Sequence, residues 1–201
     1  MSKRILAAIA TLAAAGWVTP AHATPVTYEE KVNATGSLGS SPFSNALLTF
    51  DLTADTSAVS CAPPICAVAA LTATVDVTSI GTATLTDPID VLDNSNFGGQ
   101  PIAGFGVHNQ PRLPVTVNSA FATYDLTTSI GPLSGAKISF LPTTFNTTAG
   151  ALAITGFSDA PSTFQATVEA AVPEPGTLMH FGTGAVALVG RRLRRRPTPA
   201  R

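Results

Sequence analysis

The central part of the chain, residues 24–171, has very few basic residues. It contains Lys31, Arg112 and Lys137 against eleven Asp and Glu residues, so its net charge is three minus eleven, or −8. Nucleic-acid binding needs Lys and Arg to neutralise phosphates. Electrostatic attachment to an anionic membrane surface needs them as well. The composition therefore argues against nucleic acid and membrane surfaces as partners of this region.

The same region is poor in the residues that build catalytic and sugar-binding sites. His108 is its one histidine, and a single histidine cannot build a multi-histidine zinc site. It could serve a nucleophilic triad, but no Gly-x-Ser-x-Gly elbow accompanies it. We predict that His108 lies in a surface loop at residues 104–110, near Arg112. The region also has no Trp and only Tyr28 and Tyr124, whereas carbohydrate-binding modules usually stack sugars on exposed aromatic rings.

The N-terminus has the three parts of a secretory signal peptide. Lys3 and Arg4 form a positive start, residues 5–15 are apolar, and Ala21-His22-Ala23 is a small-x-small cleavage site. We predict that residues 1–23 form a signal helix, which a signal peptidase removes at the site defined by Ala21 and Ala23.

The C-terminus combines an extended box, an apolar segment and a basic cluster. The box is Val172-Pro173-Glu174-Pro175-Gly176, and each proline pushes the residue before it to extended geometry. A helix over residues 178–193 would be about 24 Å long, shorter than the roughly 30 Å hydrocarbon core. We therefore predict a short transmembrane helix that stops at the cytoplasmic face. The membrane-stop residues are Arg191, Arg192, Arg194, Arg195 and Arg196.

This arrangement, over residues 172–196, resembles the PEP-CTERM sorting signal of Gram-negative bacteria. The resemblance implies recognition by an exosortase, which is a membrane-embedded cysteine peptidase. It also implies transient anchoring in the inner membrane, removal of the tail, and release or attachment outside the cell, often alongside exopolysaccharide production. The alternative is a retained single-span anchor. Residues 197–201 are expected to be a short disordered tail.

Alternating apolar and polar residues predict an all-β body over residues 24–171. Period-two patterns rich in Thr and Val are typical of strands, and Gly and Pro separate the runs. Antiparallel strands with one solvated face suggest a single β-sandwich or jelly-roll domain. The predicted strands cover residues 48–53, 69–77, 82–86, 122–127, 136–140 and 164–170.

Cys61 and Cys66 are the only cysteines. Because the environment outside the inner membrane is oxidising, we predict a disulfide that closes a short loop. The alternative is a redox or metal-binding pair, although the Cys-x-x-Cys spacing and a nearby histidine are lacking.

Asp87, Asp90 and Asp93, followed by Asn94 and Asn96, form an oxygen-rich segment. Hard oxygen ligands on a loop suit Ca²⁺, so the three aspartates are a candidate calcium site. The spacing matches no EF-hand, and a solvated acidic turn is the alternative. No other metal site and no cofactor are predicted.

These features predict a non-enzymatic exported protein of the cell surface or extracellular matrix, associated with exopolysaccharide or biofilm. Its partners during export would be signal peptidase and exosortase, and it would contact the membrane only through the C-terminal helix before processing. The alternatives are a carbohydrate-binding jelly-roll module, a tail-anchored periplasmic protein and a secreted hydrolase.

Overall fold

The computed structural model describes residues 24–108, 114–139 and 143–169, which form thirteen strands and two short 3-10 helices. No helix within these ranges is long and apolar enough to cross a membrane. The predicted signal helix and C-terminal helix lie outside them. The elements are β1 (Pro25–Leu38), β2 (Ser41–Asp55), η1 (Thr56–Ala58), β3 (Ser60–Ala62), β4 (Ile65–Ala69), β5 (Thr72–Val77), β6 (Gly81–Thr84), β7 (Ile89–Phe97), β8 (Gln100–Val107), β9 (Pro114–Val117), η2 (Ser119–Thr123), β10 (Ile130–Ser139), β11 (Thr143–Thr147), β12 (Gly150–Phe157) and β13 (Ser162–Val168).

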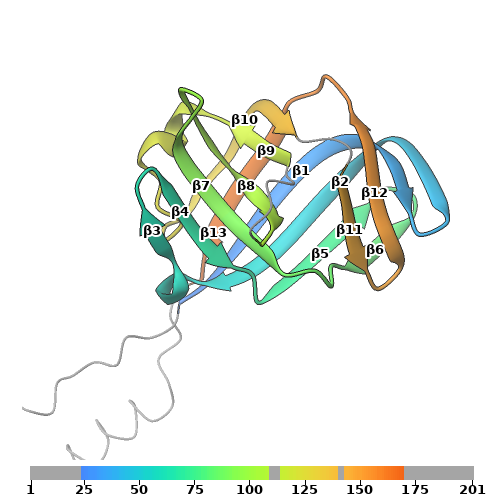
Figure 1. Ribbon diagram of the computed structural model, residues 1–201, viewed down its shortest axis with the longest axis horizontal. Coiled ribbons are helices and arrows are strands. Elements are labelled where there is room, and N and C mark those ends of the chain that lie inside the picture. Colours follow the sequence, from blue (N-terminus) through green and yellow to red (C-terminus); the bar gives the residue numbers. More distant parts are fainter. Residues whose placement is uncertain (1–23, 109–113, 140–142, 170–201) are drawn as a thin grey trace, which may run out of the picture. The chain divides into compact units, whose positions relative to one another are not determined.

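All thirteen strands belong to one antiparallel sheet (Figure 1), which confirms the predicted all-β class. The main order is β3-β4-β7-β8-β9-β10-β13-β1-β2-β5-β6, and β12 joins β11 to β1. Strand β10 links two parts of the sheet. One part contains β3, β4, β7, β8 and β9, and the other contains β13, β1, β2, β5 and β6. Its residues 130–135 pair with β13, and its residues 136–139 pair with β9.

The sheet returns on itself, so that β7 and β8 lie across β1 and β2 (Figure 1). Phe50 of β2 and Phe105 of β8 pack with ring centroids 4.5 Å apart, although their strands are far apart in the sheet order. Phe121 and Phe164 extend this contact with a centroid distance of 5.5 Å. Burying one such ring stabilises the fold by roughly 1.5–3 kcal/mol. The core therefore lies between the two layers.

Strands β1, β2, β5, β6, β11 and β12 form a closed ring of neighbours. The ring closes where Leu85, just after β6, bridges to Thr147 of β11. Thr86 N donates to Asn146 O at 2.9 Å, and Thr148 N donates to Thr84 O at 2.9 Å. These bonds join segments that are about sixty residues apart in the sequence.

The predicted strand at residues 122–127 is wrong. The 3-10 helix η2 covers its start, and the Asn118 side chain caps this helix by accepting from Ala120 N at 3.0 Å. Phe121 and Tyr124, three residues apart, are both buried. That spacing matches the three residues per turn of a 3-10 helix, so packing of the two rings overrides the local alternation.

The predicted strand at residues 69–77 is interrupted at Leu71. Ala70 N donates to Ile89 O of β7 at 2.8 Å, whereas Leu71 N donates to Thr53 O of β2 at 2.8 Å. Because β7 and β2 lie in different layers, the chain crosses between the layers here. Leu71, which the alternation placed on the apolar face, is 74% exposed.

Candidate functional sites

The residues with the clearest predicted roles lie outside the described ranges. These are the sorting box at residues 172–176, the arginines at residues 191–196, and the cleavage residues Ala21 and Ala23. Their predicted roles therefore rest on the sequence.

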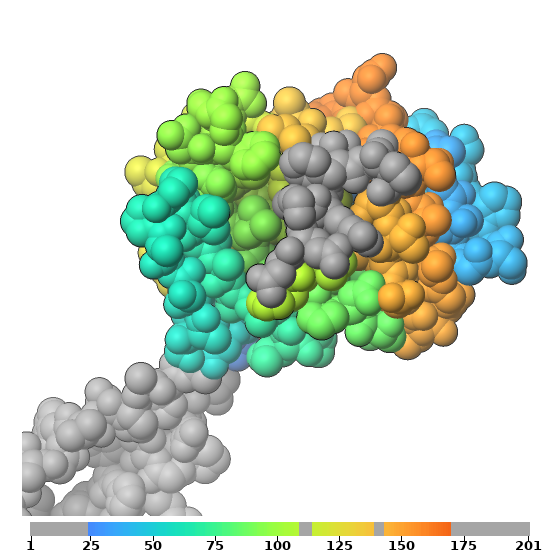
Figure 2. Space-filling view, viewed as in Figure 1, coloured from blue at the N-terminus to red at the C-terminus, as the bar shows by residue number. Residues whose placement is uncertain are grey.

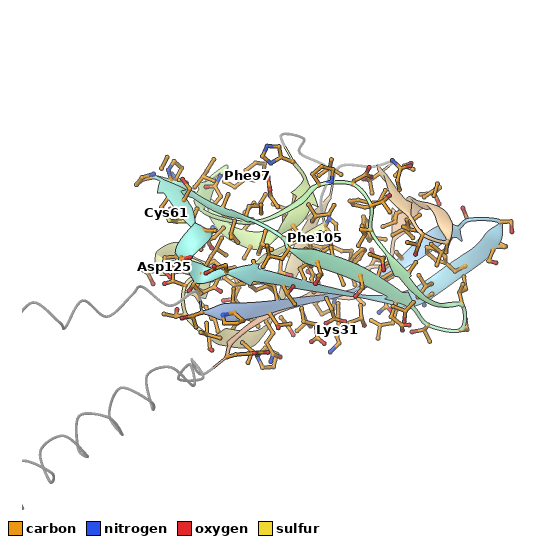
Figure 3. All side chains as sticks on the ribbon, turned by 90° about the horizontal axis from the view of Figure 1, so that it is seen from below. Lys31, Cys61, Phe97, Phe105 and Asp125 are labelled. Carbon is orange, nitrogen blue, oxygen red and sulfur yellow. A yellow bond between two sulfur atoms is a disulfide. The ribbon has the colours of Figure 1, made fainter. Side chains whose placement is uncertain are left out.

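The predicted disulfide between Cys61 and Cys66 is present. The two cysteines face each other directly across the β3–β4 hairpin. Cys61 lies at the edge of the structure, far from Phe105 in the core (Figure 3). Ser95 N of β7 donates to Pro64 O at 3.0 Å and holds the hairpin tip against the neighbouring strand.

The sequence predicted that the three aspartates of the candidate calcium site lie on a loop, but only Asp87 does, between β6 and β7. Asp90 and Asp93 belong to strand β7, where they point to opposite faces because side chains alternate along a strand. The Asp87 carboxylate accepts from Asn146 N at 2.7 Å and from Asn146 Nδ2 at 2.8 Å. Within the described residues, no group of three His, Cys, Asp or Glu side chains is placed to hold a metal ion. The structure therefore does not bring the three carboxylates together.

His108 follows β8 directly and is a surface residue, as predicted. Its side chain is 55% exposed, and its Nδ1 lies 2.5 Å from Asp90 Oδ2. The predicted loop around it is wrong at residues 104–107, which form the end of β8. Gly104 is buried there, and a Cβ at this position would come within 2.9 Å of Glu30 Oε2.

Glu30 is a buried acid that the sequence analysis missed. It continues the inward-facing series Val26-x-Tyr28-x-Glu30 of β1 and is 1% exposed. Thr116 Oγ1 lies 3.3 Å from Glu30 Oε1 and 2.8 Å from Ser162 Oγ. Burial raises the pKa of Glu30 well above its usual value. The carboxyl therefore favours its neutral form in the folded protein.

Asp93 is a second buried acid, and it lies close enough to the buried Tyr124 to act on it electrostatically. Asp93 is 1% exposed, and its Oδ1 has no hydrogen-bond partner in the described structure; neither has the buried Tyr124 hydroxyl. The Tyr28 hydroxyl donates to Leu126 O at 2.7 Å. Burial, together with the charge of Asp125, raises the pKa of Asp93 to about 7. The sequence indicated the burial of Asp93 by its position, because it continues the inward-facing series of Ile89 and Val91.

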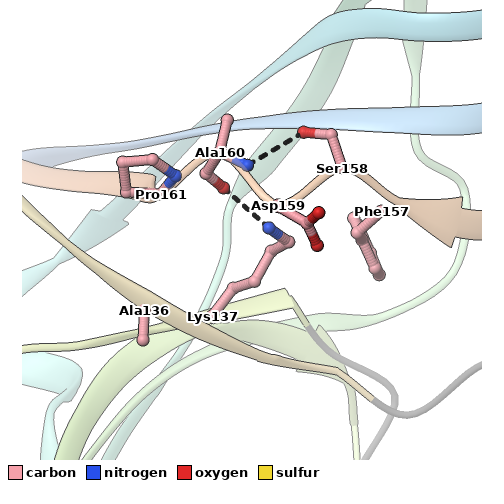
Figure 4. Close-up of a pocket in the computed structure, with 7 residues that line it drawn as sticks. All are labelled: Ala136, Lys137, Phe157, Ser158, Asp159, Ala160 and Pro161. Atoms are coloured by element: carbon pink, nitrogen blue, oxygen red, sulfur yellow. Dashed lines mark hydrogen bonds between the residues drawn. The ribbon is translucent and has the colours of Figure 1, made fainter.

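A surface hollow of about 380 Å³ lies between β10 and the turn that joins β12 to β13 (Figure 4). Lys137 Nζ donates to Ala160 O at 2.6 Å, which holds the lysine across the hollow. Phe157 offers an aromatic ring, and Asp159 offers a carboxylate. The full lining is Ala136, Lys137, Phe157, Ser158, Asp159, Ala160 and Pro161.

Comparison with known proteins identifies the C-terminal segment. The family model of the PEP-CTERM protein-sorting motif matches residues 171–196, which confirms the resemblance seen in the sequence. No curated protein and no solved structure matches the chain.

Proposed function

We propose that the chain is a non-enzymatic protein of the cell surface or extracellular matrix, which an exosortase sorts and cleaves through its C-terminal tail. The motif at residues 171–196 carries this proposal, because it implies an exported protein that an exosortase sorts at the cell surface. The role in the matrix and the association with exopolysaccharide go beyond that implication.

The outer face of β2, β5 and β6 supports a role in a hydrated matrix. The hydroxyls of Thr53 and Thr72 lie 2.6 Å apart, and Thr82 Oγ1 donates to Asp76 Oδ1 at 2.8 Å. This face presents hydroxyl and carboxylate groups in a regular array, as alternation along each strand dictates. Such a surface can exchange its hydrogen bonds with water for bonds with a polysaccharide.

The body is best classified as a β-sandwich of the jelly-roll type. The packing of Phe50 against Phe105 across two layers supports this classification, since two faces that share one core define a sandwich. The continuous pairing through β10 would then be the connection between its two sheets.

In this proposal the carboxylate of Glu174 is the recognition group of the sorting box. It is the only acid after Glu169, and the flanking prolines keep it in an extended peptide that an enzyme cleft can bind. The arginines at residues 191–196 would stop translocation and hold the box near the exosortase.

The test is an immunoblot of membrane and released fractions from hosts with and without the exosortase. We expect Glu174→Gln to accumulate with its tail in the membrane fraction, and the matched variant Glu169→Gln to be processed normally. Replacing Pro173 and Pro175 with Ala tests the extended geometry, and deletion of residues 176–201 should release the protein without sorting. A wild-type tail that stays attached equally in both hosts would show that it is a plain anchor.

Carbohydrate binding is a second candidate function, which the hollow beside β10 favours. Phe157 can stack against a sugar ring, while Lys137 and Asp159 can bond its hydroxyls; ligand sites commonly combine an apolar wall with a few polar groups. Glycan-array binding that Phe157→Ala abolishes and Phe97→Ala retains would support this function. Equal binding by both variants would exclude the hollow as the site.

A further inference from the structure

The Cys61–Cys66 disulfide is accessible from solvent. Cys61 belongs to the exposed edge strand β3, and Cys66 is half-buried in β4. Strands β3 and β4 are drawn in teal, at one edge of the face shown in Figure 2. The bond joins residues only five positions apart, in a hairpin that backbone hydrogen bonds already close. Exposed disulfides are the ones that exchange with other thiols most readily.

Asp93 lies directly behind this disulfide. Cys66 and Asp93 are direct partners in the β4–β7 pairing. Side chains of directly opposed residues point to the same face, with Cβ atoms about 4.5–5.5 Å apart. Cys66 packs against the core on its inner side, and Asp93 faces the same core. The side chains of the half-buried Cys66 and the buried Asp93 are therefore cross-strand neighbours on the inward face of the β4–β7 pair.

No structural role visible in the described residues accounts for Asp93. A buried carboxyl without a hydrogen bond to Oδ1 costs stability. The ionisable groups that interact electrostatically with it are Asp125 and Tyr124, and neither of them supplies a positive charge. On its two flanking strands its direct partners are Cys66 and Ala103. Of these two direct partners, only Cys66 carries a group that can take up or release a proton when its disulfide is reduced or formed.

We propose that Cys61–Cys66 is a thiol–disulfide exchange site in which the Asp93 carboxyl exchanges a proton with Cys66. A thiolate of an external dithiol attacks the exposed Cys61 Sγ. The S–S bond breaks, and its electron pair passes to Cys66 Sγ, which takes the proton of the Asp93 carboxyl. The second thiol of the dithiol loses its proton to solvent and attacks the dithiol's own sulfur in the mixed disulfide. This releases Cys61 as a thiolate, which solvent protonates.

These steps transfer two electrons from the external dithiol to the Cys61–Cys66 disulfide. The external dithiol is oxidised to a disulfide, and the Cys61–Cys66 pair is reduced to two thiols. In the reverse direction, the Cys61 thiolate attacks an external disulfide and forms the mixed disulfide. The Asp93 carboxylate then takes the proton from Cys66, and the resulting thiolate attacks Cys61 Sγ and releases the external thiolate. Because the carboxyl has a pKa near 7, it can serve as donor and acceptor near neutral pH.

The first test measures how fast dithiothreitol reduces the disulfide of the full-length exported protein between pH 5 and pH 9. Each rate is divided by the concentration of the dithiothreitol thiolate at that pH. We expect the wild-type rate to fall about tenfold as the pH rises through 7, which corresponds to loss of a proton donor. Asp93→Asn should react slowly at low pH and show no such step. Asp90→Asn, on the same strand with its side chain on the other face, should keep the wild-type profile. Identical profiles for wild type and Asp93→Asn would overturn the proposal.

The second test uses the wild-type protein alone, so it holds even if Asp93→Asn does not fold. Carbon-13 NMR follows the titration of the Asp93 carboxyl in the disulfide and dithiol forms. Coupling between two sites is reciprocal, so we expect the midpoint for Asp93 to change by about half a pH unit or more on reduction. An unchanged midpoint would show that Asp93 and Cys66 do not share a proton.

Discussion

At the scale of single residues, each of the two buried carboxyls makes a contribution to stability that depends on pH. Burial is the main cause that raises the pKa of Glu30 and the pKa of Asp93 in the folded protein. The folded state therefore binds more protons than the unfolded chain above the ordinary carboxyl pKa. The contribution of these two groups to stability is greatest below that ordinary value and decreases as the pH rises through the folded pKa, about 7 for Asp93. This dependence is opposite to that of the usual surface carboxylate.

We expect Glu30→Gln to raise the free energy of unfolding at pH 8 by roughly 1–3 kcal/mol relative to wild type, because it removes a buried group that must ionise. At pH 4 the two proteins should differ much less, since the amide carbonyl can still accept from Thr116. Urea denaturation at both pH values measures the effect. Glu29→Gln is the matched control, because this neighbour points outward and pairs with Lys31. If Glu30→Gln raised the free energy of unfolding more at pH 4 than at pH 8, the raised pKa of Glu30 would be contradicted.

The disulfide should contribute little to stability. We expect replacement of Cys61 and Cys66 by Ser to lower the free energy of unfolding by about 2 kcal/mol, as loop-closure entropy predicts for so short a loop. Intact mass of the non-reduced secreted protein should be lower than that of the reduced protein by two hydrogens. Two alkylatable thiols in the native secreted form would contradict the pairing.

At the scale of the elements, the β1–β12 pairing depends on a close backbone approach at Gly36. A Cβ at Gly36 would lie 1.9 Å from Ala153 O, where the register between the strands shifts. We expect Gly36→Ala to cost more than about 4 kcal/mol or to prevent folding, because neither backbone can move independently. The control is Gly156→Ala on β12, where a Cβ would have open space. Thermal melting of both secreted variants distinguishes them, and equal melting temperatures would disprove the close approach.

The closure of the strand ring depends on Asp87. Its carboxylate accepts two hydrogen bonds from Asn146 at the junction of β6 and β11. We expect Asp87→Ala to lower stability by roughly 1–3 kcal/mol and to speed amide hydrogen exchange at Thr86 and Thr148. Asp90→Ala is the control, since an exposed ion pair contributes at most about 1 kcal/mol.

At the scale of the whole molecule, the predicted signal peptide at the N-terminus should direct export, and the PEP-CTERM motif at residues 171–196 implies sorting at the cell surface. We expect replacement of Ala21 and Ala23 with Leu to leave uncleaved precursor in the membrane fraction, because the peptidase needs small residues at both positions. Ala15→Leu, in the apolar region, should still be processed. N-terminal sequencing of the secreted wild type should begin at Thr24, and a mature protein that begins at Met1 would contradict the signal peptide.

The sequence by itself determined the features that depend on neighbouring residues. The sorting box and the arginine cluster are linear motifs, so they were identified without a fold. The antiparallel all-β class followed from period-two alternation, because that period directly reflects the pleat. The disulfide followed from two cysteines that a short loop keeps close together.

Only the tertiary structure decided which strands pair and which layer each one enters. Alternation divides a strand into two faces, but it does not reveal the partner on either side. Leu71 is exposed because its backbone bonds to β2 just after Ala70 has bonded to β7. Glu30 and Asp93 occupy inward positions that a local reading assigns to apolar residues. Their burial, and the position of Asp93 beside Cys66, result from long-range pairing between segments that the sequence separates by tens of residues.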